Sequence, residues 1–281
     1  LVAKLIKLNL LIISTMLIVS LLFGVGVETY GSGGGVKGYF ASGNAIGIYV
    51  GGMLMLILSL KIHERIHVSN LFVVYVLVAL VSVGTKTSIV IALAVLLFWW
   101  VATGRRAVWP TVGGAVLAIY SQAILNALSF VYQVVLLRWR NSDNLLHFLA
   151  SGRIDYVADA FGVFEKQGYG FVRVLVGAGA TVSYQSIHPY VKFDTLETDV
   201  FDVFFMYGAI GLLLYLSFFV LVSYRLRRKP FVLAGFLLVY VHSALAGHVL
   251  FNGMNALLLA LYCGIASRSS VGGLDASKSH C

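Results

Sequence analysis

The chain has 281 residues, of which 60% are hydrophobic and only 11% are charged. Soluble globular domains carry about 25% charged residues, so this composition excludes a soluble enzyme, a disordered chain and a nucleic-acid-binding domain. The formal net charge of +9 must therefore reflect something other than nucleic-acid binding.

Eight apolar runs without Asp, Glu, Lys or Arg follow one another along the chain, at about 8–27, 44–60, 71–85, 88–102, 108–137, 203–223, 231–247 and 250–266. We predict a transmembrane helix for each, because an isolated strand leaves its backbone groups unpaired in hydrocarbon. The predicted fold is an all-α polytopic membrane protein with about eight transmembrane helices. Five of these helices lie in 1–137 and three in 203–266.

The Lys and Arg residues between the runs indicate the orientation. Segments rich in Lys and Arg face the cytoplasm, and most of the basic residues gather at the N-terminal end, in alternate connections and in the tail. We therefore predict that both termini are cytoplasmic and that 267–281 is a disordered cytoplasmic tail. The basic residues on this side are Lys4, Lys7, Lys61, Arg65, Arg105, Arg106, Arg225, Arg227, Arg228, Lys229, Arg268 and Lys278.

One long polar segment, 138–202, lies on the opposite side of the membrane in this topology. Long loops inside compact domains are usually functional, and this one holds the densest mixture of charged and polar groups. Within it, 151–166 has apolar residues at helical spacing after Ser151, a residue type that caps helices. We predict an amphipathic helix at the membrane surface. A lid on the bundle and a substrate-facing helix are both open interpretations.

Three residues near the end of this loop are candidate catalytic groups. His188 can accept a proton from a hydroxyl group near neutral pH. Glu197 or Asp199 can orient this histidine or bind hydroxyl groups. An ordinary surface role for His188 stays open, and no metal site is expected because no pair of histidines has ligand spacing.

Several cations on the same side are candidate ligands for phosphate. An arginine can bind a phosphate group through two parallel N–H groups, and a lipid-linked diphosphate needs such a clamp at the membrane surface. Contacts with lipid headgroups and loop salt bridges are the alternative interpretations. The candidates are Arg153, Arg138, Arg140 and Lys86. For His242 and His248, at the end of the seventh run, a role in helix packing is at least as plausible as a functional one.

Several stretches, in their order along the chain, resemble the O-antigen ligase/polymerase superfamily, which includes Wzy-type polymerases. ASGRIDYVADAF, residues 150–161, is similar to the Ser-Gly-Arg start of the family's outer-loop helix. VLVGAGATVSYQSIHPYV, residues 174–191, resembles its Gly-rich stretch that leads to a histidine. Further similar segments are 39–52, 83–95, 197–215 and 247–261.

The resemblance implies a GT-C-like glycosyltransferase architecture in the bacterial inner membrane, with 138–202 as a periplasmic loop. It implies an undecaprenyl-diphosphate-linked oligosaccharide as donor, no cofactor and no metal. It also implies that Arg153 holds the diphosphate and that His188 activates the acceptor hydroxyl. Lys86 stands where the family has arginine, so it keeps the positive charge and lacks the planar guanidinium group.

The activity expected from this resemblance is that of a polysaccharide polymerase for O-antigen, exopolysaccharide or capsule. It would transfer glycan from the lipid-linked donor to a lipid-linked repeat unit. An O-antigen ligase and a lipid-linked sugar transporter or flippase are the alternatives. The expected partners are membrane lipids and other polysaccharide-assembly proteins, and no nucleic acid.

Overall fold

The structure is a computed structural model of the chain. It describes residues 1–29, 35–64, 66–103, 136, 140, 153–166, 170–184 and 196–278. Before the long loop it has α1 (Val2–Phe23), β1 (Val27–Glu28), β2 (Val36–Gly38), α2 (Gly43–His63), α3 (Asn70–Ser82) and α4 (Lys86–Thr103). From the long loop onward it has α7 (Arg153–Lys166), α8 (Phe171–Val176), α9 (Gly179–Tyr184), α10 (Asp199–Leu226), α11 (Pro230–Ala246) and α12 (Gly253–Lys278).

The helical character of the predicted fold is confirmed. Helices α1, α2 and α10 are each long and apolar enough to cross a membrane, and α3, α4, α11 and α12 contain shorter apolar helices. These seven helices coincide with seven of the predicted apolar runs, whereas the run at 108–137 lies outside the described residues. The described helices are thus compatible with a membrane protein, and the number of spans stays a prediction.

Helix α2 forms the centre of the bundle. In its most apolar stretch 89% of the residues are buried, against 33% in α1 and in α10, because α1, α3, α4, α11 and α12 all pack around it. Three of its glycines, spaced by four residues, face α4 or the residue just before it, and small residues at this spacing let two helices approach closely. They are Gly43, Gly47 and Gly51, opposite Thr85, Ser88 and Ile91.

Two hydrogen bonds join α2 to the last helix of the chain. Asn255 Nδ2 donates to the carbonyl oxygen of Ala45 at 3.3 Å, and the Tyr262 hydroxyl donates to the carbonyl oxygen of Gly52 at 3.2 Å. The two helices that meet here are separated by 210 residues of sequence. The core of the bundle is therefore closed by contacts between the two ends of the chain.

Local capping residues set where the helices begin. Ser42 Oγ accepts the Ala45 N–H at the start of α2, and Ser69 Oγ accepts the Phe72 N–H at the start of α3. Pro230 occupies the first position of α11, where a missing N–H costs nothing. Each of these helices begins one residue before the apolar run that predicted it.

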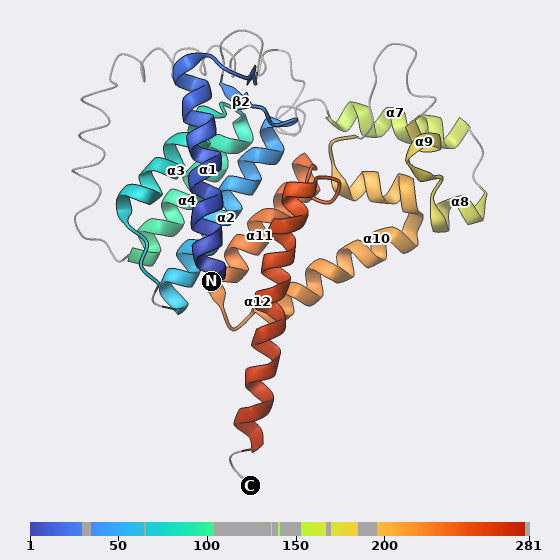
Figure 1. Ribbon diagram of the computed structural model, residues 1–281. Coiled ribbons are helices and arrows are strands. Elements are labelled where there is room, and N and C mark those ends of the chain that lie inside the picture. The colour runs from blue at the N-terminus through green and yellow to red at the C-terminus, as the bar shows by residue number, and fades with distance from the viewer. Residues whose placement is uncertain are drawn as a thin grey trace.

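Helix α10 is broken at Gly208, whose φ of 67° and ψ of −166° are not helical. Residues 199–207 leave the bundle and lie beside α7, α8 and α9 (Figure 1). Residues 209–226 extend about 27 Å at 1.5 Å per residue, close to the roughly 30 Å of a bilayer's hydrocarbon core. A second, smaller core holds the first part of α10 against the long-loop helices; it contains Ala160, Phe164, Leu196, Phe205 and Met206.

Helix α7 confirms the predicted helix at 151–166. The N-terminus and the last residues of α12 lie at the end of the bundle away from α7 and β2 (Figure 1). They share one side in this arrangement, and which side of the membrane that is stays a prediction.

Two features differ from the sequence expectation or were not foreseen. Helix α12 continues to Lys278, into 267–281 where a disordered tail is predicted; no proline interrupts this stretch, and a helix once nucleated propagates readily. The short antiparallel pair β1–β2 was not predicted.

Candidate functional site

A group of charged side chains gathers where the start of α10 meets α7 and the connection between α11 and α12. Arg153 Nη2 donates to Glu197 Oε2 at 2.8 Å, and Glu197 Oε1 lies 3.9 Å from His248 Nε2. The side chains of Arg153, Glu197 and His248 are 12%, 41% and 23% exposed. We call these three residues the polar cluster. It places one carboxylate between two nitrogen groups that a ligand can reach from outside.

Glu197 and His248 share an unusual backbone conformation. Their φ angles are 57° and 61°, and within the described part of the chain no other non-glycine residue has a positive φ. This left-handed conformation costs an ordinary L-residue roughly 1–2 kcal/mol. Such strained residues concentrate at functional sites. Here the two strained residues are the two whose side chains face one another.

The buried carboxylate of Asp199 fastens the α11–α12 connection to the start of α10. Its Oδ2 accepts the backbone N–H groups of Val249 and Leu250, each at 3.1 Å, and the Ser243 hydroxyl at 2.5 Å. The Ser243 oxygen accepts the Tyr215 hydroxyl at 3.1 Å. Asp199 is only 1% exposed, so its bonds serve to position the segment that follows His248.

Further contacts hold the polar cluster in place on its His248 side and on its Glu197 side. The carbonyl oxygen of His248 accepts Asn255 Nδ2 at 2.7 Å. Gly247 adopts φ +61°, and a Cβ there would lie 2.6 Å from the Glu197 carbonyl carbon. Only glycine therefore allows the two backbones to come this close. On the Glu197 side, Asp202 Oδ1 and Oδ2 accept the N–H groups of Leu196 and Thr198 at 2.7 and 3.3 Å.

Several buried polar atoms at this junction have no hydrogen-bond partner among the described residues. Buried polar atoms are normally paired, so this junction holds an unusual concentration of unpaired donors and acceptors. They are Arg153 Nε, Thr198 Oγ1, Asp199 Oδ1, His242 Nε2 and Asn255 Oδ1.

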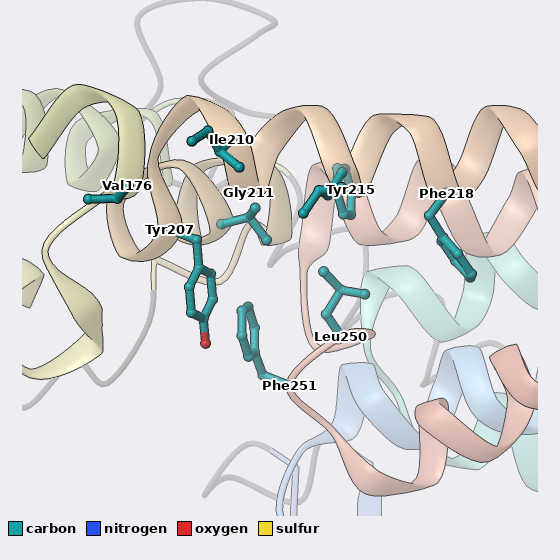
Figure 2. A pocket seen from close by; sticks show the side chains of 10 residues that line it. Val176, Tyr207, Ile210, Gly211, Tyr215, Phe218, Leu250 and Phe251 are labelled. Carbon is teal, nitrogen blue, oxygen red and sulfur yellow. The ribbon is translucent and has the colours of Figure 1, made fainter. Parts of the chain in front are cut away.

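An apolar groove of about 450 Å³ runs along α10 beside the polar cluster. Leu250 and Phe251, which follow His248 closely, line it together with Val203, one turn after Asp199. Figure 2 shows the Tyr207 and Phe251 rings next to each other within this lining. The remaining lining residues are Val176, Ile210, Gly211, Leu214, Tyr215 and Phe218. A groove of this composition suits an apolar chain.

The structure brings together three of the predicted site residues: Arg153, Glu197 and Asp199. Lys86 is the first residue of α4, which packs mainly against α2 and α3, and Arg140 is an exposed residue. His188 and Arg138 lie outside the described residues.

Sequence reasoning did not single out three residues that build this site, and it left His248 open between helix packing and function. A signal for them exists, because polar residues inside or beside apolar helices are rare and commonly functional. The three are Tyr215, Ser243 and Asn255.

Protein-family models, curated proteins and solved structures were each compared with this chain, and none matches. In the part of the chain that the structure describes, no group of three or more His, Cys, Asp or Glu side chains is placed to hold a metal ion. Function is therefore inferred from the geometry of the polar cluster and its groove, together with the sequence resemblance.

Proposed function

We propose that the protein is a membrane glycosyltransferase of GT-C-like architecture that polymerises a polysaccharide at the periplasmic face of the bacterial inner membrane. It transfers glycan from undecaprenyl diphosphate to the terminal sugar of another lipid-linked repeat unit. The observation that supports this most is the polar cluster beside an apolar groove, in a chain whose other long helices are almost free of charge. This pairing suits a substrate with an anionic headgroup and a long apolar chain.

Arg153 is the residue best placed to hold the diphosphate. Its guanidinium group is fixed by Glu197, and two N–H groups of an arginine match the oxygens of a phosphate. Because negative charge develops on the departing diphosphate, a cation already in position lowers the barrier to transfer. Arg138, Arg140 and Lys86 remain the proposed additional cations.

The two candidate carboxylates have different roles in this proposal. Glu197 is partly exposed and contacts Arg153, so it aligns the guanidinium group and faces the substrate. Asp199 is buried and occupied by three donors, so it positions the segment that follows His248. The resemblance gives His188 the role of the base that activates the acceptor hydroxyl.

A transporter or flippase for the same lipid-linked sugars is the second candidate. It is favoured by His242, a buried histidine inside the apolar helix α11, because ionisable residues within spans often mark transport pathways. Lipid-scrambling activity that survives replacement of Arg153 would favour this candidate.

The test is reconstitution of the purified protein in proteoliposomes with lipid-linked repeat units, followed by a glycan gel. We expect a ladder of polymer from the wild type and a loss of about 100-fold in rate with Arg153→Lys, which keeps the charge and removes the fork. Arg228→Lys, just after α10, is the matched control and should behave like the wild type. Absence of polymer from the wild type, while a known polymerase makes it, would contradict the proposal. Transfer of finished polymer to a different acceptor would instead identify a ligase.

A further inference from the structure

His248 is placed more precisely than its position in a connection between two helices requires. Its carbonyl oxygen is held by Asn255, the next backbone N–H is held by Asp199, and Gly247 lets its backbone approach Glu197. Its own backbone is left-handed. All of these constraints fix the backbone that carries one imidazole ring.

That ring faces Glu197, which is itself fixed by Arg153. The resulting order, guanidinium to carboxylate to imidazole, joins α7, the start of α10 and the α11–α12 connection. An imidazole oriented by a carboxylate that is held by a third group is the arrangement that makes an effective base. The Nε2 to Oε1 distance of 3.9 Å exceeds a hydrogen bond, and such bonds commonly tighten only when the substrate is bound.

We infer that His248 is a catalytic residue of this site, the general base that takes the proton of the acceptor hydroxyl, with Glu197 as its positioning residue. This inference rests on the proposed glycosyl transfer, and it gives His248 the role that the resemblance gives to His188.

The step balances without a further reactant. The acceptor oxygen forms a bond to the anomeric carbon, and the bond from that carbon to the diphosphate oxygen breaks. The electron pair of the broken bond leaves with the diphosphate beside Arg153. The hydroxyl proton moves to Nδ1 of His248, while Nε2 faces the Glu197 carboxylate and shares the positive charge with it.

The charged and titratable groups that the structure places around His248 come from every element packed against it. Glu197 and Asp199 lie at the start of α10, Arg153 on α7 and His242 on α11. Asp199 uses Oδ2 for three donors, whereas Glu197 Oε1 lies 3.9 Å from the ring nitrogen Nε2 of His248. Glu197 is thus the negative group that faces the imidazole when the ring takes the proton, while Arg153 contacts the other oxygen of the same carboxylate.

The left-handed backbone decides which variants are informative. Asn is among the few residues that tolerate positive φ, so His248→Asn removes the base while it keeps the backbone. His67→Asn, an exposed histidine in the α2–α3 connection, is the matched control. Glu197→Asn tests the positioning residue under the same backbone rule.

The experiment is the pH dependence of polymerisation in proteoliposomes, with thermal unfolding of each variant as a check on folding. We expect His248→Asn to unfold at the wild-type temperature, to lose at least about 100-fold in kcat and to lose the acid limb of the profile. Glu197→Asn should lower kcat by about 10-fold, a part of that effect. His67→Asn should keep the wild-type kcat and pH profile. His188→Asn should keep the acid limb of the profile.

Two outcomes would overturn the inference in distinguishable ways. If the wild type makes no polymer, the proposed function fails and the inference fails with it. If the wild type is active and His248→Asn keeps its rate and acid limb, or if the acid limb disappears with His188→Asn instead, the proposed function stands and His248 is not the base.

Discussion

The carboxylate of Asp199 accepts three hydrogen bonds with one oxygen while it is almost completely buried. We predict that Asp199→Ala lowers the free energy of unfolding by about 3 kcal/mol, because a buried donor left without its partner costs roughly 1–3 kcal/mol. The measurement is unfolding of the purified protein by an SDS titration. Asp159→Ala, an exposed carboxylate on α7, should change nothing, and an equally small effect at Asp199 would contradict its proposed role.

At the scale of single residues, the sequence named two members of the polar cluster as candidate site residues, and their chemical roles stay predictions. Arg153 and Glu197 were both predicted from residue type and position in the loop, and they meet although 44 residues separate them. For His248 the sequence left helix packing and function open, because its direction depends on a left-handed backbone and on partners at Asp199 and Asn255. Neither can be derived from hydropathy.

At the scale of elements, two glycines at the α8–α9 junction separate two physical effects. Gly177 and Gly179 have nearly equal φ angles, +74° and +73°. A Cβ on Gly177 would lie 2.4 Å from the Met206 carbonyl carbon, whereas a Cβ on Gly179 meets nothing within 4 Å. Gly208 of α10 fits against the Leu175 carbonyl in the same way, so the two backbones interlock at the break in α10.

We predict that Gly179→Ala costs only the conformational term of about 1–2 kcal/mol, and that Gly177→Ala costs more. The reason is that the second change must also separate α8 from α10 and weaken the bond from the Ala178 N–H to the Phe205 carbonyl oxygen. The same SDS titration measures both variants. Equal losses would show that the close backbone contact contributes nothing.

Apolar runs predicted the helices of the bundle well and the break in α10 not at all. The sequence of α10 is apolar on both sides of Gly208, so its hydropathy predicts one continuous span from 203 to 223. The break depends on the fit of Gly208 against Leu175, which is a tertiary contact. Similarly, α1 begins at Val2 rather than near residue 8, because a helix can contain Lys4 and Lys7 at its end while their charged groups reach water.

For the whole molecule, the distribution of basic residues predicts a cytoplasmic location for both termini. We expect that a membrane-impermeant maleimide labels Asp159→Cys in intact spheroplasts and labels His67→Cys only after permeabilisation. Both variants are made after Cys263→Ala and Cys281→Ser, which remove the native thiols. The two positions are exposed, so labelling reports the side of the membrane, and the reverse pattern would contradict the predicted orientation.

The bonds between α2 and α12 have a consequence for biogenesis. The Ala45 and Gly52 carbonyl oxygens meet their partners on α12 only after 210 further residues have been made. At roughly 5–20 residues per second this takes about 10 to 40 s. During that interval the nascent α2 exposes to lipid, or to the insertion machinery, a face that the mature protein conceals. A chain arrested before residue 250 lacks α12 and cannot cover that face. The face then stays exposed, and membrane proteases can recognise the incomplete chain by it.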